Sequence, residues 1–224
     1  MSRYKLACFD LDGTVIDDTV FVWQTIHDYL DTSNDERMKA QDAYFSGKIS
    51  YRQWAEHDIM LWKEAGATKE KIEAAIRPMR LMKGARETLD TLRDTGMELA
   101  VISGSLDIAL EHVLPDYDDY FEVVYINKLI FDGNGEISAI DTNPYDISRK
   151  GEGLTKIASN KGIDLSQCVF VGDHFNDVSV AKLAGLSIAF NCKSEELAEV
   201  SDVIIKEPDL TNILKHILGS HLNR

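Results

Sequence analysis

The sequence predicts an α/β fold: a doubly wound parallel sheet, interrupted by an inserted helical segment and a β-hairpin. Short apolar runs alternate with amphipathic helical patterns, which is typical of parallel strands covered by helices on both faces. One long stretch near the N-terminus is helical throughout, and one stretch near the middle is extended around a turn sequence. These three observations together favour one layered α/β core that carries two additions, the inserted helical segment and the hairpin.

Five apolar runs are expected to be the buried strands of this core. They span residues 4–10, 98–103, 168–173, 186–190 and 203–205. Helical patterns separate or follow them at residues 85–96, 151–161, 177–184, 194–200 and 210–218. Strands that alternate with helices in this way form right-handed crossovers and a parallel sheet.

Two segments break the alternation. Residues 17–82 have a helical pattern without a strand, and all three tryptophans lie in them. We expect these residues to form a cap domain inserted over the sheet edge, and residues 1–16 and 83–224 to form the core domain. Residues 121–140 read as extended, with the turn sequence DGNG at residues 132–135, which predicts a hairpin.

The composition limits the classes of partner. The chain has 224 residues and a formal net charge of −14, so nucleic acid and anionic membrane surfaces are not expected to bind it. No apolar run is long enough to span a membrane, and the chain enters a strand at once, without the pattern of a signal peptide. The three cysteines lack metal-binding spacing. A cytoplasmic protein is therefore expected, and the sequence leaves its oligomeric state open.

Polar residues follow three of the expected strands. Asp10, Ser103 and Asp173 each end an apolar run, and the carboxyl ends of parallel strands share one edge of the sheet, where ligands bind. Asp12 and Asp177 add carboxylates close by in sequence. A cluster of carboxylate oxygens without a thiol suits Mg²⁺, so a magnesium site is expected at this edge.

Other residues around these strand ends suit a phosphate group. Ser103 and Gly104 precede a helix expected near residue 106, so they can offer a hydroxyl and backbone N–H groups. Gly13 and Thr14 can offer further amides, and Lys150 opens a helix and can neutralise an anion as a point charge. Together with the paired acids, these residues indicate phosphoryl transfer by a carboxylate nucleophile and a second acid.

In these motifs the chain resembles the haloacid dehalogenase superfamily, and within it the phosphoserine-phosphatase-like branch. "DLDGT" resembles the first motif, "SGS" the second, Lys150 the third and "GDHFND" the fourth, and Lys150 lies 23 residues before Asp173, as in that branch. The resemblance implies an α/β core of Rossmann type and an Mg²⁺ cofactor. It also implies the following roles: nucleophile, Asp10; general acid/base and metal ligand through its carbonyl, Asp12; phosphate binding, Ser103, Gly104 and Lys150; metal ligand, Asp173; water shell of the metal, Asp177; polar substrate contact, Asn176.

The chain departs from this branch where the substrate's amino-acid groups are held. In phosphoserine phosphatases a Glu nine residues after the nucleophile binds the substrate amine, and that position is Thr19 here. The position of the cap Arg that binds the substrate carboxylate falls on Asp58. Asp58 lies on an apolar helical stripe, where a carboxylate finds a partner or faces a cavity. If it faces the cavity, we expect the substrate to present a cation or a hydroxyl there.

The predicted function is an Mg²⁺-dependent phosphatase of a small phosphorylated metabolite. Phosphoserine phosphatase with a rearranged pocket, transfer of the phosphoryl group to an acceptor other than water, and a catalytically silent binding module remain alternatives. The intact set of acids and lysine argues against the silent module. The cap aromatics form either a lobe core or the floor of a substrate pocket, and His174 either packs or reaches the leaving group.

Overall fold

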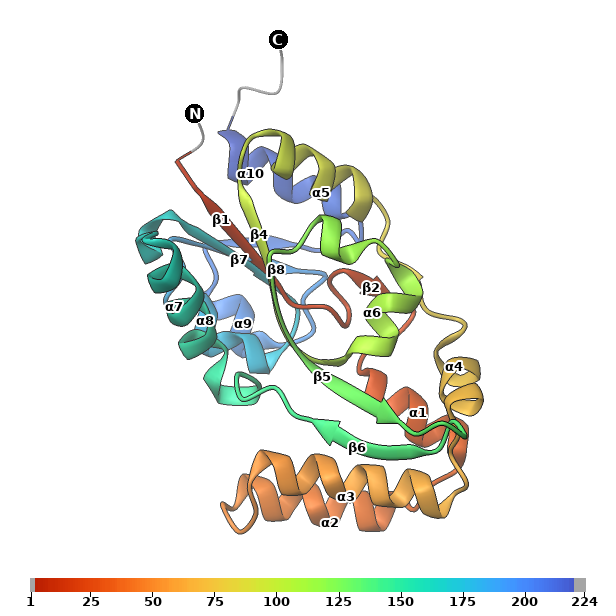
Figure 1. Cartoon of the computed structure of the whole chain (residues 1–224). Coiled ribbons are helices and arrows are strands. Elements are labelled where there is room, and N and C mark those ends of the chain that lie inside the picture. Colours follow the sequence, from red (N-terminus) through yellow and green to blue (C-terminus); the bar gives the residue numbers. More distant parts are fainter. Residues whose placement is uncertain (1–2, 220–224) are drawn as a thin grey trace.

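The computed structural model describes residues 3–219, in which seven strands form one sheet. The strands are β1 (Leu6–Phe9), β4 (Glu98–Leu106), β5 (Val123–Phe131), β6 (Ile137–Asp141), β7 (Cys168–Gly172), β8 (Leu186–Phe190) and β9 (Val203–Ile205). Their order is β6-β5-β4-β1-β7-β8-β9 (Figure 1). Neighbours are parallel except β5 and β6, which are antiparallel. The expected α/β fold class is confirmed.

Helices cover both faces of the sheet because alternate residues of each strand point to opposite sides. Ala7 and Phe9 of β1 pack in one core cluster with α5 (Ala85–Asp94), α6 (Asp107–Val113) and α10 (Leu214–Leu218). Leu6 and Cys8 pack in another with α7 (Lys150–Lys161) and α8 (Val178–Ala181), and α9 (Glu195–Val200) packs beside α8. Both faces are buried, which explains why the strands read as continuous apolar runs.

Four helices lie between the first strand and α5. They are α1 (Val22–Leu30), α2 (Asn34–Phe45), α3 (Tyr51–Glu64) and α4 (Lys69–Ile76). Ser33, Ser50 and Thr68 cap the N-termini of α2, α3 and α4 with side-chain hydrogen bonds. The expectation of no strand in this segment is wrong at its ends, since β2 (Ile16–Asp17) and β3 (Arg80–Leu81) pair as a short antiparallel ribbon. This ribbon joins the chain leaving the core to the chain returning to it.

The β5–β6 hairpin packs against these helices. Helix α3 packs against β6, and the amide of Lys69 donates to the carbonyl of Gly135 in the hairpin turn. In Figure 1, α2 and α3 lie alongside the hairpin, away from α5 and α10. The hairpin expected from the DGNG turn is present, and its first strand also continues the main sheet beside β4.

Two expected elements differ in extent. The helix expected at residues 177–184 is a 3-10 turn, Phe175–Asp177, followed by the short α8. Strand β4 does not end at Ser103 but continues to Leu106, with an irregularity in its pairing after Ile102. The irregular segment, Ser103–Ser105, bends out of the ladder, so polar side chains stand within a strand instead of at its end.

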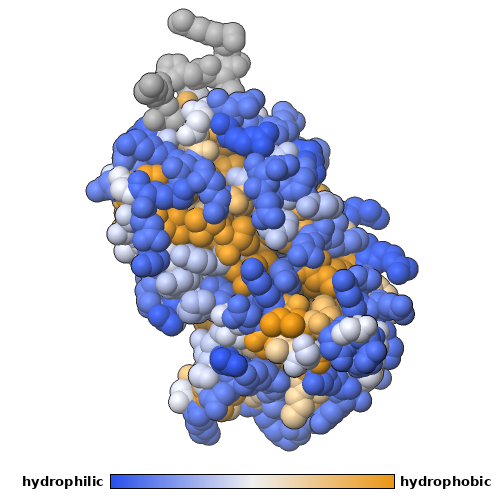
Figure 2. All heavy atoms as spheres, viewed as in Figure 1, coloured by the Kyte–Doolittle hydropathy of each residue, from blue (hydrophilic) through white to orange (hydrophobic). Residues whose placement is uncertain are grey.

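The surface agrees with the acidic composition. Figure 2 shows a largely hydrophilic face on which apolar residues gather toward the middle. Over residues 3–219, none of the helices combines the length and the hydropathy needed to cross a membrane.

Candidate active site

The first two acids sit where the central strand ends. The amide of Asp10 donates to the Val171 carbonyl (2.9 Å), which holds Asp10 beside the end of β7. Asp10 is 3% exposed and Asp12 is 6% exposed. Gly13 follows with a φ of 76°, and a side chain at this position would collide with the carboxylate of Asp173. The chain can therefore turn tightly against the site only with glycine here.

The amides of this turn are not directed at a ligand, contrary to the expectation from the sequence. Gly13 donates its N–H to the Ile16 carbonyl (2.9 Å), and Thr14 donates to the Leu11 carbonyl (3.0 Å). Both amides are used to close the loop that leads to β2. Their hydrogen bonds therefore stabilise the turn and leave anion binding to other groups.

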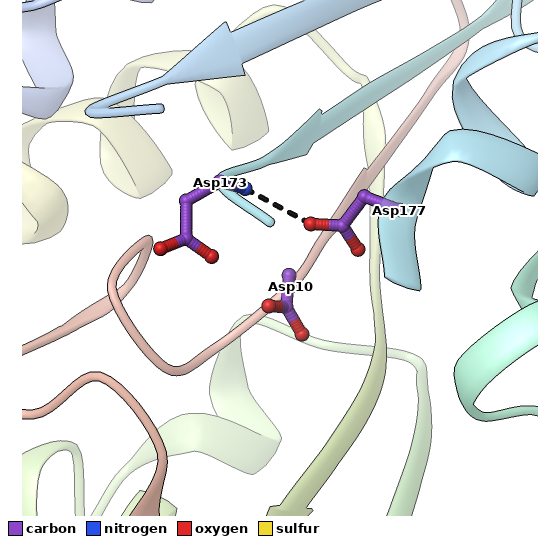
Figure 3. A group of neighbouring side chains, drawn as sticks. All are labelled: Asp10, Asp173 and Asp177. Atoms are coloured by element: carbon purple, nitrogen blue, oxygen red, sulfur yellow. Dashed lines mark hydrogen bonds between the residues drawn. The ribbon is translucent and has the colours of Figure 1, made fainter. Parts of the chain in front are cut away.

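Asp10, Asp173 and Asp177 form a buried carboxylate cluster. One oxygen from each lies within 4.8 Å of the others, and Figure 3 shows the three carboxyl groups around one small space, supplied by β1 and the loop after β7. Both oxygens of Asp177 already accept hydrogen bonds, one from Lys150 and one from the amides of Asp173 and His174. Hard oxygen donors in this arrangement fit a divalent cation such as Mg²⁺, with Asp177 in an outer position.

Two lysines offset the charge of this cluster. Lys150 is fully buried, and its Nζ donates to Asp10 Oδ1 (2.8 Å) and to Asp177 Oδ1 (2.6 Å). Burial alone lowers the pKa of Lys150, but the charges of Asp10 and Asp177 outweigh it and raise that pKa above its ordinary value. Lys193 Nζ donates to Asp173 Oδ2 (2.6 Å) from a more open position.

Burial raises the pKa of two carboxyl groups in this cluster. Burial first, and then the charge of Asp10, raises the pKa of Asp173 well above its ordinary value. Burial also raises the pKa of Asp177 to about 6, although Lys150 opposes the shift. A cation between these groups favours their ionised forms and so reverses both effects.

Asp12 is held apart from this cluster by its own hydrogen bonds. Its Oδ2 accepts from the amide of Val22 at the start of α1 (2.8 Å), and its Oδ1 accepts from the Ser105 hydroxyl (2.7 Å). Burial raises the pKa of Asp12 to about 7, although both hydrogen bonds oppose the rise. A carboxyl group in this range can hold or release a proton near neutral pH.

The segment Ser103–Ser105 is fixed from behind by two asparagines. Asn127 Nδ2 donates to the Gly104 carbonyl (2.8 Å), and Asn143 Nδ2 donates to the Ser103 carbonyl (3.0 Å). The Asn143 amide in turn donates to Asn127 Oδ1 (2.8 Å). Because Ser103, Asn127 and Asn143 are buried, these hydrogen bonds hold the segment in one conformation beside Asp10 and Asp12.

A pocket opens from these residues toward the helices of the inserted segment. It encloses about 130 Å³. Its polar lining comprises Asp10, Asp12, Arg37, Gln41, Asp58, Ser103, Gly104, Ser105, Asp146 and Asn176, and its aromatic lining comprises Phe21, Trp23, Phe45, Tyr51, Trp54 and Phe175. These residues, which we call the active-site pocket, come both from the core and from α1–α3.

Not all of the residues expected to contact the substrate line the active-site pocket. Asp58 and Asn176 line the active-site pocket, as do Ser103 and Gly104. Thr19 does not; its hydroxyl lies 3.0 Å from that of Thr25. The chain turns through Asp18, which has a φ of 62°, before α1 begins, and a contact of Thr19 with the substrate stays a prediction.

His174 packs rather than facing open solvent. Its ring lies 4.9 Å from that of Phe21 and 5.0 Å from that of Phe175, both edge-on. Burial lowers its pKa, and the charge of Lys193 adds to the effect. A neutral imidazole that joins the inserted helices to the loop after β7 follows from this arrangement.

Several site residues escaped the sequence analysis. Arg37 and Gln41 reach the active-site pocket from α2, and Asp146 reaches it from the loop before α7. Ser105 is the second serine of the SGS motif, so its polarity beside Ser103 was a usable signal. Lys193 follows β8 without any motif, so its contact with Asp173 left no signal in the sequence.

Asp10 is a buried aspartate at the end of a strand, and Lys150 contacts it. Further acids lie at the same edge of the sheet. This arrangement is typical of a phosphoryl-transferring hydrolase on an α/β core. The family model of haloacid dehalogenase-like hydrolases matches residues 4–185. The chain therefore belongs to this family, and it is a phosphatase of the phosphoserine-phosphatase-like branch.

Similar proteins support this assignment. The chain is 33% identical to a phosphoserine phosphatase of Methanocaldococcus jannaschii over 96% of its own length and 98% of that protein. It is 26% identical to the pyridoxal phosphate phosphatase PHOSPHO2 of Rattus norvegicus over 77% of this chain and 75% of that one. A solved phospho-aspartyl intermediate analogue of phosphoserine phosphatase superposes with a TM-score of 0.75 at 33% identity, covering 96% of this chain and 99% of the other.

Proposed function

We propose that this chain is an Mg²⁺-dependent phosphatase that hydrolyses a small phosphorylated metabolite through an aspartyl-phosphate on Asp10. The contact of the fully buried Lys150 with Asp10 is the observation that carries the proposal. A buried lysine that donates a hydrogen bond to a strand-end carboxylate fixes the orientation of that carboxylate, as a nucleophile requires. It also brings a positive charge to the place where a phosphoryl group would bind.

In the first step, an oxygen of Asp10 attacks the phosphorus of the ester. The bond from phosphorus to the Asp10 oxygen forms while the bond from phosphorus to the alcohol oxygen breaks. Asp12, oriented by Val22 and Ser105, gives its proton to the departing alcohol. Ser103 and Gly104 bind the phosphoryl oxygens, and Lys150 offsets their charge.

In the second step, Asp12 takes a proton from water. That water attacks the phosphorus of the aspartyl-phosphate, and the bond to Asp10 breaks. Inorganic phosphate leaves and Asp10 returns as a carboxylate. The same Asp12 oxygen therefore serves as acid and then as base, which requires that its orientation persist through both steps.

Asp10, the Asp12 carbonyl and Asp173 would hold the Mg²⁺ ion, with Asp177 binding its water shell. The ion supplies Lewis-acid stabilisation of the phosphoryl oxygens when it is bound. The carboxylate cluster supports this choice because its donors are all hard oxygens and no thiol or imidazole is among them. Displacement of Lys193 from Asp173 would make room for the ion.

We further propose that residues 17–82 act as a cap domain over a core made of residues 1–16 and 83–224. The cap supplies most of the aromatic lining of the active-site pocket and would exclude bulk water during the transfer. Trp23 supports this role, because its indole N–H donates to the Gly104 carbonyl (2.8 Å) across the two parts. A cytoplasmic location stays a prediction.

The test is hydrolysis of p-nitrophenyl phosphate with Mg²⁺, by the wild type and by the Asp10→Asn variant. We expect turnover by the wild type, loss of at least 1000-fold in the variant (roughly the span of a missing nucleophile), and dependence on the metal. Absence of turnover in the wild type, or turnover unaffected by the substitution, would leave a silent binding module. O-phosphoserine belongs in the same assay, since proteins similar to this chain are named phosphoserine phosphatases.

A further inference from the structure

Asp58 is a buried carboxylate without a hydrogen bond on one of its oxygens. It projects from α3 and is 4% exposed, and its Oδ1 has no hydrogen-bond partner among the described residues. That oxygen lies 3.5 Å from His27 Nε2 and 3.9 Å from His57 Nδ1, contacts of ion-pair length without hydrogen-bond geometry, and neither histidine lines the active-site pocket. A carboxylate in such a place is costly unless a donor reaches it.

Oxygen acceptors without partners recur along the same pocket. Within residues 3–219, Asp146 Oδ1 and Asn176 Oδ1 are buried and lack hydrogen bonds, as Asp58 Oδ1 does. The guanidinium of Arg37, by contrast, already donates to the side-chain carbonyl of Gln24. Among the pocket-lining indoles, Trp54 has an unpartnered N–H. Four acidic side chains line the active-site pocket against one basic side chain, that of Arg37, which suits a ligand that brings N–H groups.

Aromatic rings surround the space between these acceptors. Trp54 stacks on Tyr44 at 5.0 Å between ring centres, which holds its ring in place. The ring centres of Phe45 on α2 and Phe175 in the core lie 6.5 Å apart. Aromatic faces attract cations and stack on flat apolar groups. The volume of about 130 Å³ compares with the roughly 150 Å³ of an engineered cavity that binds benzene.

On the basis of the phosphatase function proposed above, we infer that the leaving alcohol carries a protonated amine on a flat apolar frame, and that Asp58 binds this amine. The ester phosphate lies against Asp10, and the frame occupies the ring-lined space. The ammonium fills the vacant acceptor on Asp58 and gains from the aromatic faces around it. Asp58 is thereby a specificity-determining residue, remote from the bonds that change.

The experiment compares three benzyl phosphates whose leaving alcohols share the benzyl frame and differ only in the para substituent. These are 4-(aminomethyl)benzyl phosphate, its uncharged isostere 4-ethylbenzyl phosphate, and 4-carboxybenzyl phosphate. Values of kcat/KM are measured for the wild type and for Asp58→Asn, which keeps the size and removes the charge. Asp42→Asn, on the exposed side of α2, is the control for loss of one cap carboxylate.

We expect the wild type to prefer the aminomethyl ester over the ethyl ester by about 10- to 100-fold, the range of one charge-assisted hydrogen bond. Asp58→Asn should remove most of this preference, chiefly through KM. Asp42→Asn should keep the preference.

The inference is overturned if the wild type uses the three esters equally. It is also overturned if the wild type prefers the carboxybenzyl ester, which Arg37 would favour. In both cases hydrolysis of the esters still supports the phosphatase function. An unchanged preference in folded Asp58→Asn would also overturn the inference. If that variant does not fold, the ester preference of the wild type decides alone. Failure to hydrolyse any ester, p-nitrophenyl phosphate included, would instead refute the proposed function.

Discussion

Replacing Lys150 by methionine removes a buried positive charge and keeps an unbranched side chain. In the wild type this ammonium contacts Asp10 at 2.8 Å and Asp177 at 2.6 Å, and all three groups are at most 3% exposed. Breaking a buried ion pair by removing one partner costs about 3–5 kcal/mol. For a chain of this size, about 1 kcal/mol shifts Tm by about 2–4 °C, so Tm should fall by about 6–20 °C.

The assay is thermal unfolding followed by circular dichroism, with EDTA and then with Mg²⁺. We expect the full loss of Tm in EDTA. Mg²⁺ should restore part of it, because a cation bound to the carboxylate cluster replaces some of the missing charge. Lys156→Met is the matched control, since Lys156 lies on the same helix, α7, but is exposed. Its Tm should change by less than about 2 °C, as for most surface substitutions.

A Tm in EDTA that stays within 2 °C of the wild type would refute the reasoning. It would mean that removing Lys150 leaves no costly unpaired charge behind, so the two buried ion pairs would not contribute to stability. A fall of equal size in Lys156→Met would show instead that α7 tolerates no methionine.

Three further outcomes are expected. Ser105→Ala should lower kcat about ten-fold, with KM within two-fold, because the hydrogen bond that orients Asp12 is lost; steady-state kinetics checks this, and an unchanged kcat contradicts it. Leu89→Ala, at a fully buried position on α5, should lower the free energy of unfolding by about 2–5 kcal/mol; urea unfolding measures it, and a loss below about 1 kcal/mol is incompatible with a packed core there. Mg²⁺ at about 100 times its Kd should raise that free energy by about 2.7 kcal/mol in the wild type, and much less in Asp173→Asn; equal gains in both would place the ion elsewhere.

The sequence was sufficient to predict where the chemistry is held. Parallel strands covered on both faces must be apolar, so the polar residues that interrupt these runs, Asp10, Ser103 and Asp173, stood out. The rule that strand ends share one edge then brought together residues far apart in the chain. The expected fold class and the convergence of these residues rest on general properties of sheets, which do not depend on how individual side chains pack.

The lining of the active-site pocket could not be predicted in the same way. Whether a residue on a cap helix faces the pocket depends on how that helix is rotated and where it docks. Arg37 and Asp58 come from different helices, and only packing of α2 and α3 brings both to one cavity. Thr19 shows the reverse case, because an offset of nine residues from Asp10 carries no information about a turn through left-handed backbone at Asp18.

The sequence also could not predict which polar side chains form hydrogen bonds with the site residues. Ser105 and Asp12 are 93 residues apart, and Lys193 and Asp173 are 20 apart. Such pairs form because a buried acceptor needs a donor, but many serines and lysines in the sequence could have met that need. The pairing is decided by the final geometry of the loops, which the hydrophobic pattern does not encode.

All three tryptophans of the chain lie in the cap helices, and none lies in the core. Trp23 donates its indole N–H to Gly104 across the boundary, Trp54 lines the active-site pocket, and Trp62 is fully buried beside Trp23. The tryptophan fluorescence of the protein, excited selectively over that of tyrosine, is therefore an optical signal of the proposed cap. Opening of the cap, or entry of a ligand beside Trp54, would change the emission without an added label, so stopped-flow fluorimetry can time these events on the unmodified chain.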